Sequence, residues 1–200
     1  MIQIEPICID LFCGRFGWGL GFRDAGYLVI GVDNDPRSSK YADGMGFIEA
    51  DIRDVPGQDF PPARAVVASP PCQELSMARN LSRRYNKRRD PETGMILVRE
   101  AIRFIHENRP TYWCIENVHG GVAPISAELG PPRLRKHSYY LWGNFPGFLL
   151  PTSDRLRKFH SVETRADSHR YWGYKGVRSP ALRALIPYAL ARSLADACLP

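Results

Sequence analysis

The sequence lacks the features of membrane-spanning and secreted proteins. It contains no apolar run approaching the ~20 residues that a membrane-spanning helix needs. Its first six residues lack the basic start and apolar stretch of a signal peptide, so we expect a cytoplasmic protein with no membrane partner. With 200 residues, 44% of them apolar, the chain is long enough for one compact globular domain.

The cysteines lack the spacing of a metal or disulfide site. The five cysteines form no C-x-x-C pair, and no histidine cluster accompanies them. A disulfide framework and a zinc site are both disfavoured, and no metal is expected. Apart from Cys72, the cysteines are expected to be small buried apolar residues.

Negative charge is in the minority. The formal net charge of +6 suits a polyanionic partner. The basic residues gather in two stretches, for which a solvated basic surface is the alternative interpretation. The first stretch contains Arg79, Arg83, Arg84, Lys87, Arg88 and Arg89, and the second begins with Arg155, Arg157 and Lys158.

Short apolar runs alternate with amphipathic stretches, which is the pattern of a parallel α/β sheet. Strands are expected over residues 6–12, 27–32, 47–51, 65–68, 112–116 and 139–142. A helix is expected from Asp90-Pro91 to just before Pro110, and an amphipathic helix from Pro187 to about Cys198. The expected fold class is α/β with a mostly parallel central sheet.

A glycine-rich turn follows the first expected strand, with the sequence Asp10-Leu11-Phe12-Cys13-Gly14-Arg15-Phe16-Gly17. Glycines there let the backbone approach a ligand, and the following helix offers free N–H groups to a carboxylate. The second strand is followed by Asp33, at a place where a carboxylate commonly holds ribose hydroxyls. These residues indicate a nucleotide site, with a ligand-free strand–helix turn as the alternative.

Two further motifs follow expected strands, at the edge where open α/β sheets build their sites. They are Ser69-Pro70-Pro71-Cys72-Gln73 and Glu116-Asn117-Val118. Together with the glycine-rich turn they resemble, in the same order, the motifs of the cytosine-C5 DNA methyltransferases. The small size resembles that of phage-encoded members. The resemblance implies a Rossmann-like fold that binds S-adenosylmethionine.

The resemblance also implies covalent catalysis. Cys72 would add to C6 of a flipped cytosine, and Glu116 would assist at N3 with a raised pKa. Asn117 would fix the loop, and Arg135 would contact the base oxygen or steady Glu116. The methyl group would pass to C5, leaving S-adenosylhomocysteine. The catalytic set expected on this basis is Cys72, Gln73, Glu116, Asn117 and Arg135.

The resemblance likewise implies a donor site and a DNA-contacting surface. The donor site would comprise Asp10, Phe12, Gly14, Phe16, Gly17, Asp33, Asn34, Asp51, Ile52 and Pro70. DNA would be contacted by Arg79, Arg83, Arg84, Lys87, Arg88, His137, Arg155 and Arg157. The expected partner is DNA, double-stranded or single-stranded, with strongly salt-dependent affinity.

The expected organisation has three parts. Residues 1–142 would form the catalytic domain, 143–180 a minimal target-recognition segment, and 181–200 a C-terminal helix packing back on the catalytic domain. So short a recognition segment predicts short or relaxed sequence specificity.

The sequence departs from the family pattern at three further places. Phe16 replaces a usual glycine, and His137 stands where a second arginine is usual. Residues 183–187 keep only the Ile-Pro end of a donor-contacting segment, and Arg183 there would suit a modified donor with an extra carboxylate.

The sequence is also compatible with three other functions. An amino-methyltransferase shares the Ser69-Pro70-Pro71 pattern but needs an aromatic ring where this chain has Cys72. A non-catalytic nucleic-acid-binding relative is a second alternative. A methyltransferase acting on RNA or on a free cytosine nucleotide is a third.

Overall fold

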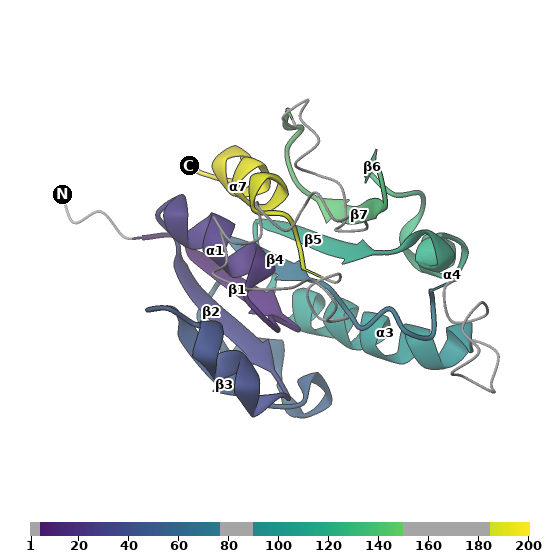
Figure 1. Ribbon diagram of the computed structural model, residues 1–200, viewed down its shortest axis with the longest axis horizontal. Coiled ribbons are helices and arrows are strands. Elements are labelled where there is room, and N and C mark those ends of the chain that lie inside the picture. Colours follow the sequence, from purple (N-terminus) through teal and green to yellow (C-terminus); the bar gives the residue numbers. More distant parts are fainter. Residues whose placement is uncertain (1–4, 77–89, 150–184) are drawn as a thin grey trace, which may run out of the picture.

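A seven-stranded sheet forms the centre of the molecule (Figure 1). The computed structural model describes residues 5–76, 90–149 and 185–200, and every structural statement concerns these residues. The strand order is β3-β2-β1-β4-β5-β7-β6. The strands are β1 (Ile7–Leu11), β2 (Leu28–Asp33), β3 (Gly46–Glu49), β4 (Ala65–Ala68), β5 (Tyr112–Asn117), β6 (Leu134–Lys136) and β7 (Tyr139–Asn144). β1 to β5 run parallel and β7 runs antiparallel to β5 and β6, so the expected mostly parallel sheet is confirmed.

Helices cover both faces of this sheet. The α-helices are α1 (Gly17–Asp24), α3 (Pro91–Asn108), α4 (Val122–Leu129) and α7 (Tyr188–Ala197). Short 3₁₀ helices are η1 (Pro36–Tyr41), η2 (Ile52–Asp54), η3 (Gly57–Asp59) and η4 (His119–Gly121). Figure 1 shows α1 and α7 on one face, and α3 and α4 on the other. Among the described helices, none is long and apolar enough to span a bilayer.

The central strands are apolar on both faces because each face is covered by helices. Along β4, all four residues are buried. Side chains alternate between the faces, so Val67 and Cys114 pack towards α1 and α7, while Val66 and Ile115 pack towards α3. This leaves the carboxyl ends of the parallel strands as the place for polar groups.

Helix α3 begins where the sequence predicts. The carboxylate of Asp90 accepts hydrogen bonds from the backbone N–H groups of Glu92 and Thr93, and Pro91 occupies the first helical turn. The helix ends at Asn108, and the next residue, Arg109, has a φ of 55° that stops the helical path just before Pro110.

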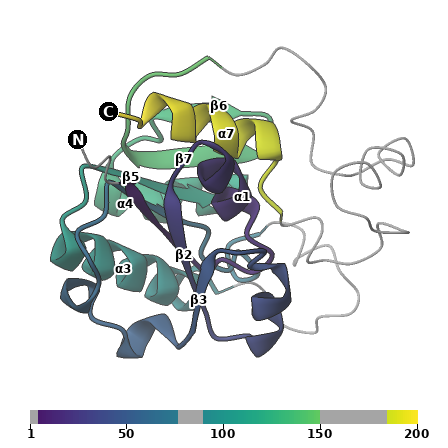
Figure 2. The same cartoon turned by 90° about the vertical axis from the view of Figure 1, so that its left-hand side faces the viewer.

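Helix α7 packs against α1 (Figure 2), and the two backbones approach closely. A Cβ atom on Gly21 would come within 2.6 Å of the backbone carbon of Ala191, and one on Gly17 within 2.9 Å of the nitrogen of Ile186. Tyr188 adds a hydrogen bond from its hydroxyl to the Asp24 carboxylate at 2.9 Å. The described C-terminal residues are therefore part of the layer that covers the first strands.

Of the expected organisation, only part falls within the described residues. Strand β7 ends at Asn144, two residues beyond the expected end of the catalytic domain. Most of the expected recognition segment, residues 150–180, lies outside the described residues.

Candidate active site

Two adjoining cavities lie at the carboxyl ends of the parallel strands. The larger, about 480 Å³, is lined by Phe12, Val32, Asp33, Asn34, Ala50, Asp51, Ile52, Arg53, Ser69, Pro70, Pro71, Cys72, Gln73, Thr93, Ile96, Leu97, Glu116 and Val118. The smaller, about 200 Å³, is lined by Asp10, Phe12, Cys13, Gly14, Arg15, Gly17, Trp18, Ser69, Leu185 and Ile186. Phe12 and Ser69 line both and therefore lie between them.

Most of the described residues that the sequence predicts for the site are brought together here. The larger cavity joins Cys72, Gln73 and Glu116 with six of the expected donor residues, Phe12, Asp33, Asn34, Asp51, Ile52 and Pro70. The smaller holds Asp10, Gly14 and Gly17. Phe16 lines neither cavity, because its ring is fully buried beneath the turn.

The glycine-rich turn after β1 has an unusual backbone. Phe12, Gly14 and Phe16 all have left-handed conformations, with φ of 58°, 49° and 57°. The carboxylate of Asp33 stabilises this path, since one oxygen accepts the Gly14 N–H at 2.9 Å and the other the Asp35 N–H at 2.8 Å. Asp33 thus ties the end of β2 to the turn, and each of its oxygens keeps a lone pair for a ligand.

Asp10 is a buried carboxyl group at the floor of the smaller cavity. Only 1% of the residue is exposed, and one carboxyl oxygen accepts the Gly19 N–H at 2.9 Å. Burial raises the pKa of Asp10 from 3.8 to about 8, although the bond from Gly19 opposes this shift. Asp10 therefore changes protonation near neutral pH.

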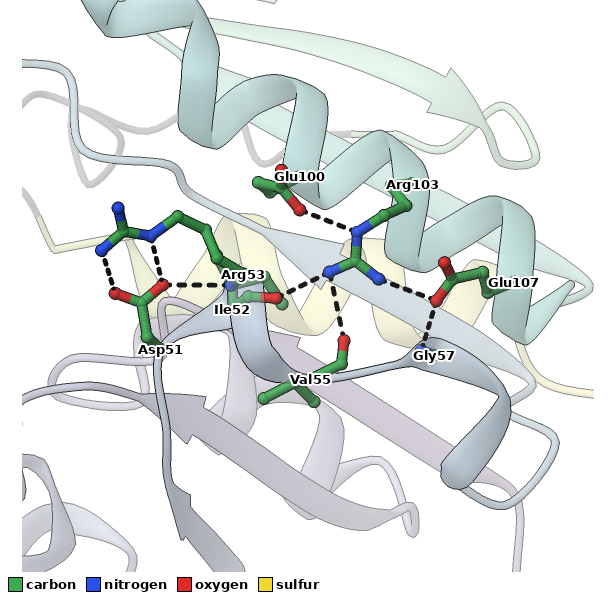
Figure 3. Close-up of polar contacts among 8 residues, drawn as sticks. All are labelled: Asp51, Ile52, Arg53, Val55, Gly57, Glu100, Arg103 and Glu107. Carbon is green, nitrogen blue, oxygen red and sulfur yellow. Dashed lines mark hydrogen bonds and ion pairs between the residues drawn. The ribbon is translucent and has the colours of Figure 1, made fainter.

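The pKa of Asp51 is shifted in the opposite direction to that of Asp10. Its carboxylate caps η2 and forms an ion pair with Arg53 at 2.6 Å (Figure 3). Hydrogen bonds from Arg53 lower the pKa of Asp51 to about 2, so this carboxylate is charged over the whole physiological range.

Helix α3 holds the segment that carries Asp51 and Ile52. Arg103 donates hydrogen bonds to the carbonyl oxygens of Ile52 and Val55, at 2.7 and 3.2 Å (Figure 3). Glu107 accepts the Gly57 N–H at 2.7 Å. These bonds fix one wall of the larger cavity on a rigid element.

The loop that carries Cys72 is anchored from two sides. From β5, the side-chain amide of Asn117 donates to the carbonyl oxygen of Pro70 at 3.2 Å, while its oxygen accepts the Val118 N–H at 2.9 Å. From α1, the indole N–H of Trp18 donates to the hydroxyl of Ser69 at 3.0 Å. Sequence reasoning missed Trp18, because a buried aromatic residue in an amphipathic helix is normally part of the core.

Tyr139 is a second residue that sequence reasoning missed. In the β5–β7 ladder Glu116 pairs with Leu141, so Tyr139, two positions earlier on β7, projects from the same face as Glu116. Both side chains are buried, with 6% of Glu116 and 1% of Tyr139 exposed. Burial, and in addition the Glu116 carboxyl, raises the pKa of Tyr139, so its phenol stays neutral.

The structure does not bring Arg135 and His137 to these cavities. Arg135 pairs with Tyr140 across the β6–β7 ladder, and its guanidinium lies 5.3 Å from the centre of the Tyr140 ring. Because side chains alternate along β7, this is the face of the sheet opposite to Glu116. Neither Arg135 nor His137 is among the described residues that line either cavity.

The remaining expected contacts lie outside the described residues. They are Arg79, Arg83, Arg84, Lys87, Arg88, Arg155 and Arg157.

The sequence that forms this site is similar to those of known proteins. Residues 7–127 match the family described as C-5 cytosine-specific DNA methylase. The chain is 32% identical over 129 residues to the type II methyltransferase M.AgeI of Thalassovita gelatinovora, covering 56% of this chain and 28% of that protein. It is 35% identical over 121 residues to the type II methylase M.HgiDII of Herpetosiphon aurantiacus, covering 55% and 32%. The chain thus spans about a third of the length of these curated relatives.

Similarity to solved structures is weaker. A putative DNA modification methyltransferase encoded within an E. coli prophage has 19% identity and a TM-score of 0.49, over 76% of this chain and 50% of that one. A DNMT2 mutant of Spodoptera frugiperda has 16% identity and a TM-score of 0.46, over 72% and 52%.

Proposed function

The chain belongs to the C-5 cytosine-specific DNA methylase family, and from this premise we propose that it methylates C5 of cytosine in DNA with Cys72 as nucleophile. One observation carries the proposal. Cys72 and Glu116 line the same cavity as Phe12, Asp33 and Ile52, so a nucleophile and an acid lie in one hollow with residues suited to a nucleoside. We expect the protein to be cytoplasmic and to associate with DNA.

S-adenosylmethionine is the methyl donor of this family, and the residues present fit it. The side chains of Phe12 and Ile52 offer apolar surface to an adenine ring, and the Asp33 carboxylate suits ribose hydroxyls. The first turn of α1, which follows the glycine-rich turn, suits the donor carboxylate. When bound, the donor supplies a methyl group on a positively charged sulfur.

The chemistry of the chain's own residues begins at Cys72. Its thiolate forms a bond to C6 of the base, and the electron pair of the C5–C6 double bond makes C5 nucleophilic. The Glu116 carboxyl donates a proton at N3, which neutralises the charge that addition pushes onto the ring. C5 then bonds to the donor methyl group while the bond from that methyl group to the donor sulfur breaks, and its electron pair stays on the sulfur as a neutral thioether. Water takes the C5 proton, the C5–C6 double bond re-forms, and the C6–sulfur bond breaks to return the Cys72 thiolate. The proton at N3 returns to Glu116.

The neighbouring residues act by position. Asn117 holds the carbonyl of Pro70, two residues before Cys72, and Gln73 lines the cavity beside the nucleophile. The neutral phenol of Tyr139 lies on the Glu116 side of the sheet, where a positively charged partner would favour an ionised Glu116. The exposed guanidinium of Arg135 is better placed for a DNA phosphate than for the base.

The partner that we propose is DNA, with the basic residues of 79–89 and 155–157 as contacts to phosphate. A cytosine inside a duplex is inaccessible, so duplex substrate would need the base flipped out. RNA, single-stranded DNA and free cytosine nucleotide are the alternatives that the same site chemistry would accept.

The test is covalent trapping on oligonucleotides that contain 5-fluorocytosine. Fluorine at C5 cannot leave as a proton, so the Cys72 adduct would accumulate after methyl transfer. Wild-type protein and Cys198→Ala should form a donor-dependent adduct on denaturing gels, whereas Cys72→Ser should form none. Parallel reactions on duplex DNA, single-stranded DNA, RNA and dCMP, followed by nucleoside analysis, identify the substrate and the methylated atom. An adduct with Cys72→Ser, or none with any substrate, contradicts the mechanism.

A further inference from the structure

The indole of Trp18 connects the two halves of the candidate active site. Trp18 belongs to α1, the helix that follows the glycine-rich turn, and only 1% of it is exposed. Its N–H donates to the Ser69 hydroxyl at 3.0 Å, and both residues line the smaller cavity. A buried indole N–H needs an acceptor, and here the acceptor belongs to the loop that carries the nucleophile.

Ser69 lies at the boundary between the two cavities. It follows β4 directly, lies three positions before Cys72, and lines both cavities. Its backbone N–H reaches the carbonyl oxygen of Leu11 at 3.4 Å, so the residue is tied to β1 by its backbone and to α1 by its side chain. A shift of α1 is therefore transmitted to the start of the nucleophile loop.

The loop is thus held at two neighbouring residues by two different parts of the protein. Asn117 holds the Pro70 carbonyl from the side of Glu116, and Trp18 holds the Ser69 hydroxyl from the side of the glycine-rich turn. The first bond joins the loop to β5, the strand that carries Glu116. The second joins the loop to α1, the helix that follows the glycine-rich turn.

We propose that Trp18, acting through the Ser69 hydroxyl, is a positioning residue that sets the spacing between the donor and the base held at Cys72. The proposal rests on the proposed function. Methyl transfer requires the reacting carbon atoms to meet at about 3–3.5 Å in line, and a displacement of about 1 Å can cost about a hundredfold in rate. A fixed link between the two cavities meets this requirement.

The experiment compares variants that remove one partner of the bond at a time. Trp18→Phe keeps a buried aromatic ring but loses the N–H, Ser69→Ala loses the acceptor, and the double variant loses both. Trp142→Phe is the matched control. Trp142 is also 1% exposed and donates its N–H to the Gly130 carbonyl at 3.2 Å, but it lines neither cavity.

Single-turnover methyl transfer and the KM for S-adenosylmethionine are measured for each full-length protein. Trp18→Phe and Ser69→Ala should each lower the transfer rate about tenfold, with KM changed less than about twofold, because the bond orders the reacting groups rather than the bound donor. The double variant should also lose about tenfold, since both changes remove the same bond. Trp142→Phe should transfer the methyl group at the wild-type rate. This should hold even if urea unfolding shows that Trp142→Phe is destabilised as much as Trp18→Phe.

Several results would overturn the inference. They are an unchanged rate in Trp18→Phe, a hundredfold loss in the double variant, an equal loss in Trp142→Phe, or a change confined to KM. A wild-type protein that transfers no methyl group to any cytosine substrate would instead remove the proposed function, and this inference with it. A wild-type protein that is active beside an equally active Trp18→Phe would remove this inference alone.

Discussion

Phe16 occupies a left-handed backbone position, with φ of 57° and ψ of 42°, where a glycine would be unstrained. This conformation costs a non-glycine residue about 1–2 kcal/mol. Its ring is fully buried, and burial of a phenylalanine side chain contributes about 1.5–3 kcal/mol, which offsets the strain. The ring fills the space beside Gly31 on β2 and Gly19 on α1, where any Cβ atom would overlap it. Gly31 and Gly19 thus leave the space that the Phe16 side chain needs.

Gly31→Ala should therefore destabilise the protein by about 1–3 kcal/mol, because the new methyl group overlaps the Phe16 ring. Adding Phe16→Leu should recover part of this loss. The control is Gly46→Ala on the adjacent strand β3, whose new Cβ would meet its nearest neighbour at an ordinary 3.5 Å. Urea unfolding measures all of these variants, and equal losses at Gly31 and Gly46 would contradict the packing argument.

Asp10 gives the protein a predictable dependence on pH. Its pKa of about 8 in the folded state, against the ordinary 3.8, means that the folded chain retains a proton that the unfolded chain has lost. Stability from this group is therefore fully present below about pH 4 and is lost as the pH rises towards 8. Asp10→Asn removes the titrating group but keeps an oxygen that accepts the Gly19 N–H.

The free energy of unfolding should consequently fall less between pH 5 and pH 8 in Asp10→Asn than in wild type. Urea titrations at both pH values measure this difference. All other titratable groups are common to the two proteins, so comparing the two differences isolates Asp10. Equal falls in the two proteins would show that Asp10 is ionised throughout.

Among the elements, long apolar runs were the easiest to predict. Buried runs gave β1, β2, β4, β5 and β7 to within one or two residues, and the Asp90-Pro91 cap gave the start of α3. Strand β6 was missed because its three residues carry no apolar pattern and are ordered by pairing with β7. Helix α4 was missed because Pro124 reads as a breaker, although proline is tolerated in the first turn of a helix.

The candidate site was predictable where a motif names residues close together in sequence. Cys72 and Gln73 follow β4 and Glu116 lies near the end of β5, and parallel strands bring their carboxyl ends to one edge. Trp18 and Tyr139 were not predictable, because buried aromatic residues look alike whether they fill the core or hold a functional group. The surroundings of Arg135 depend on the β6–β7 pairing, which sequence spacing does not reveal.

The contact between α1 and α7 gives a prediction about elements. Gly21→Ala should push α7 away from α1, because the new Cβ would lie 2.6 Å from the Ala191 backbone. Leu185 and Ile186, which precede α7 and line the smaller cavity, would move with it. We expect affinity for S-adenosylmethionine to fall about tenfold, or about 1.4 kcal/mol, in isothermal titration calorimetry. Gly147→Ala, which adds a methyl group in open space, should bind as wild type does; an equal affinity in Gly21→Ala would contradict this.

At the scale of the whole molecule, charge dominates the expected interaction with DNA. The chain has 27 lysine and arginine residues against 21 acidic ones, and the excess is concentrated in two basic stretches. Each phosphate neutralised releases counterions, so binding should weaken steeply as salt increases.

Fluorescence anisotropy on a duplex between 50 and 200 mM salt should give a straight plot of log K against log salt, with a slope of about −0.9 per phosphate contact. Replacing Arg83 and Arg84 together by alanine should make this slope shallower by about 2. Replacing Arg37 and Arg53, which are paired with Asp35 and Asp51, should leave the slope unchanged. Equal slopes in all three proteins would mean that residues 83 and 84 contact no phosphate.

The order in which the chain is synthesised has a consequence for donor binding. Leu185 and Ile186 line the smaller cavity, and Tyr188 bonds to Asp24, 164 positions earlier in the chain. At about 5–20 residues per second, a ribosome needs roughly 8–33 s to travel from one to the other. Throughout that interval the glycine-rich turn has been synthesised, whereas Leu185 and Ile186 have not. A nascent chain that ends between residues 117 and 184 contains both Cys72 and Glu116 but lacks Leu185 and Ile186, so its smaller cavity is incomplete. We therefore expect such a chain to bind S-adenosylmethionine more weakly than a chain that includes residues 185–200.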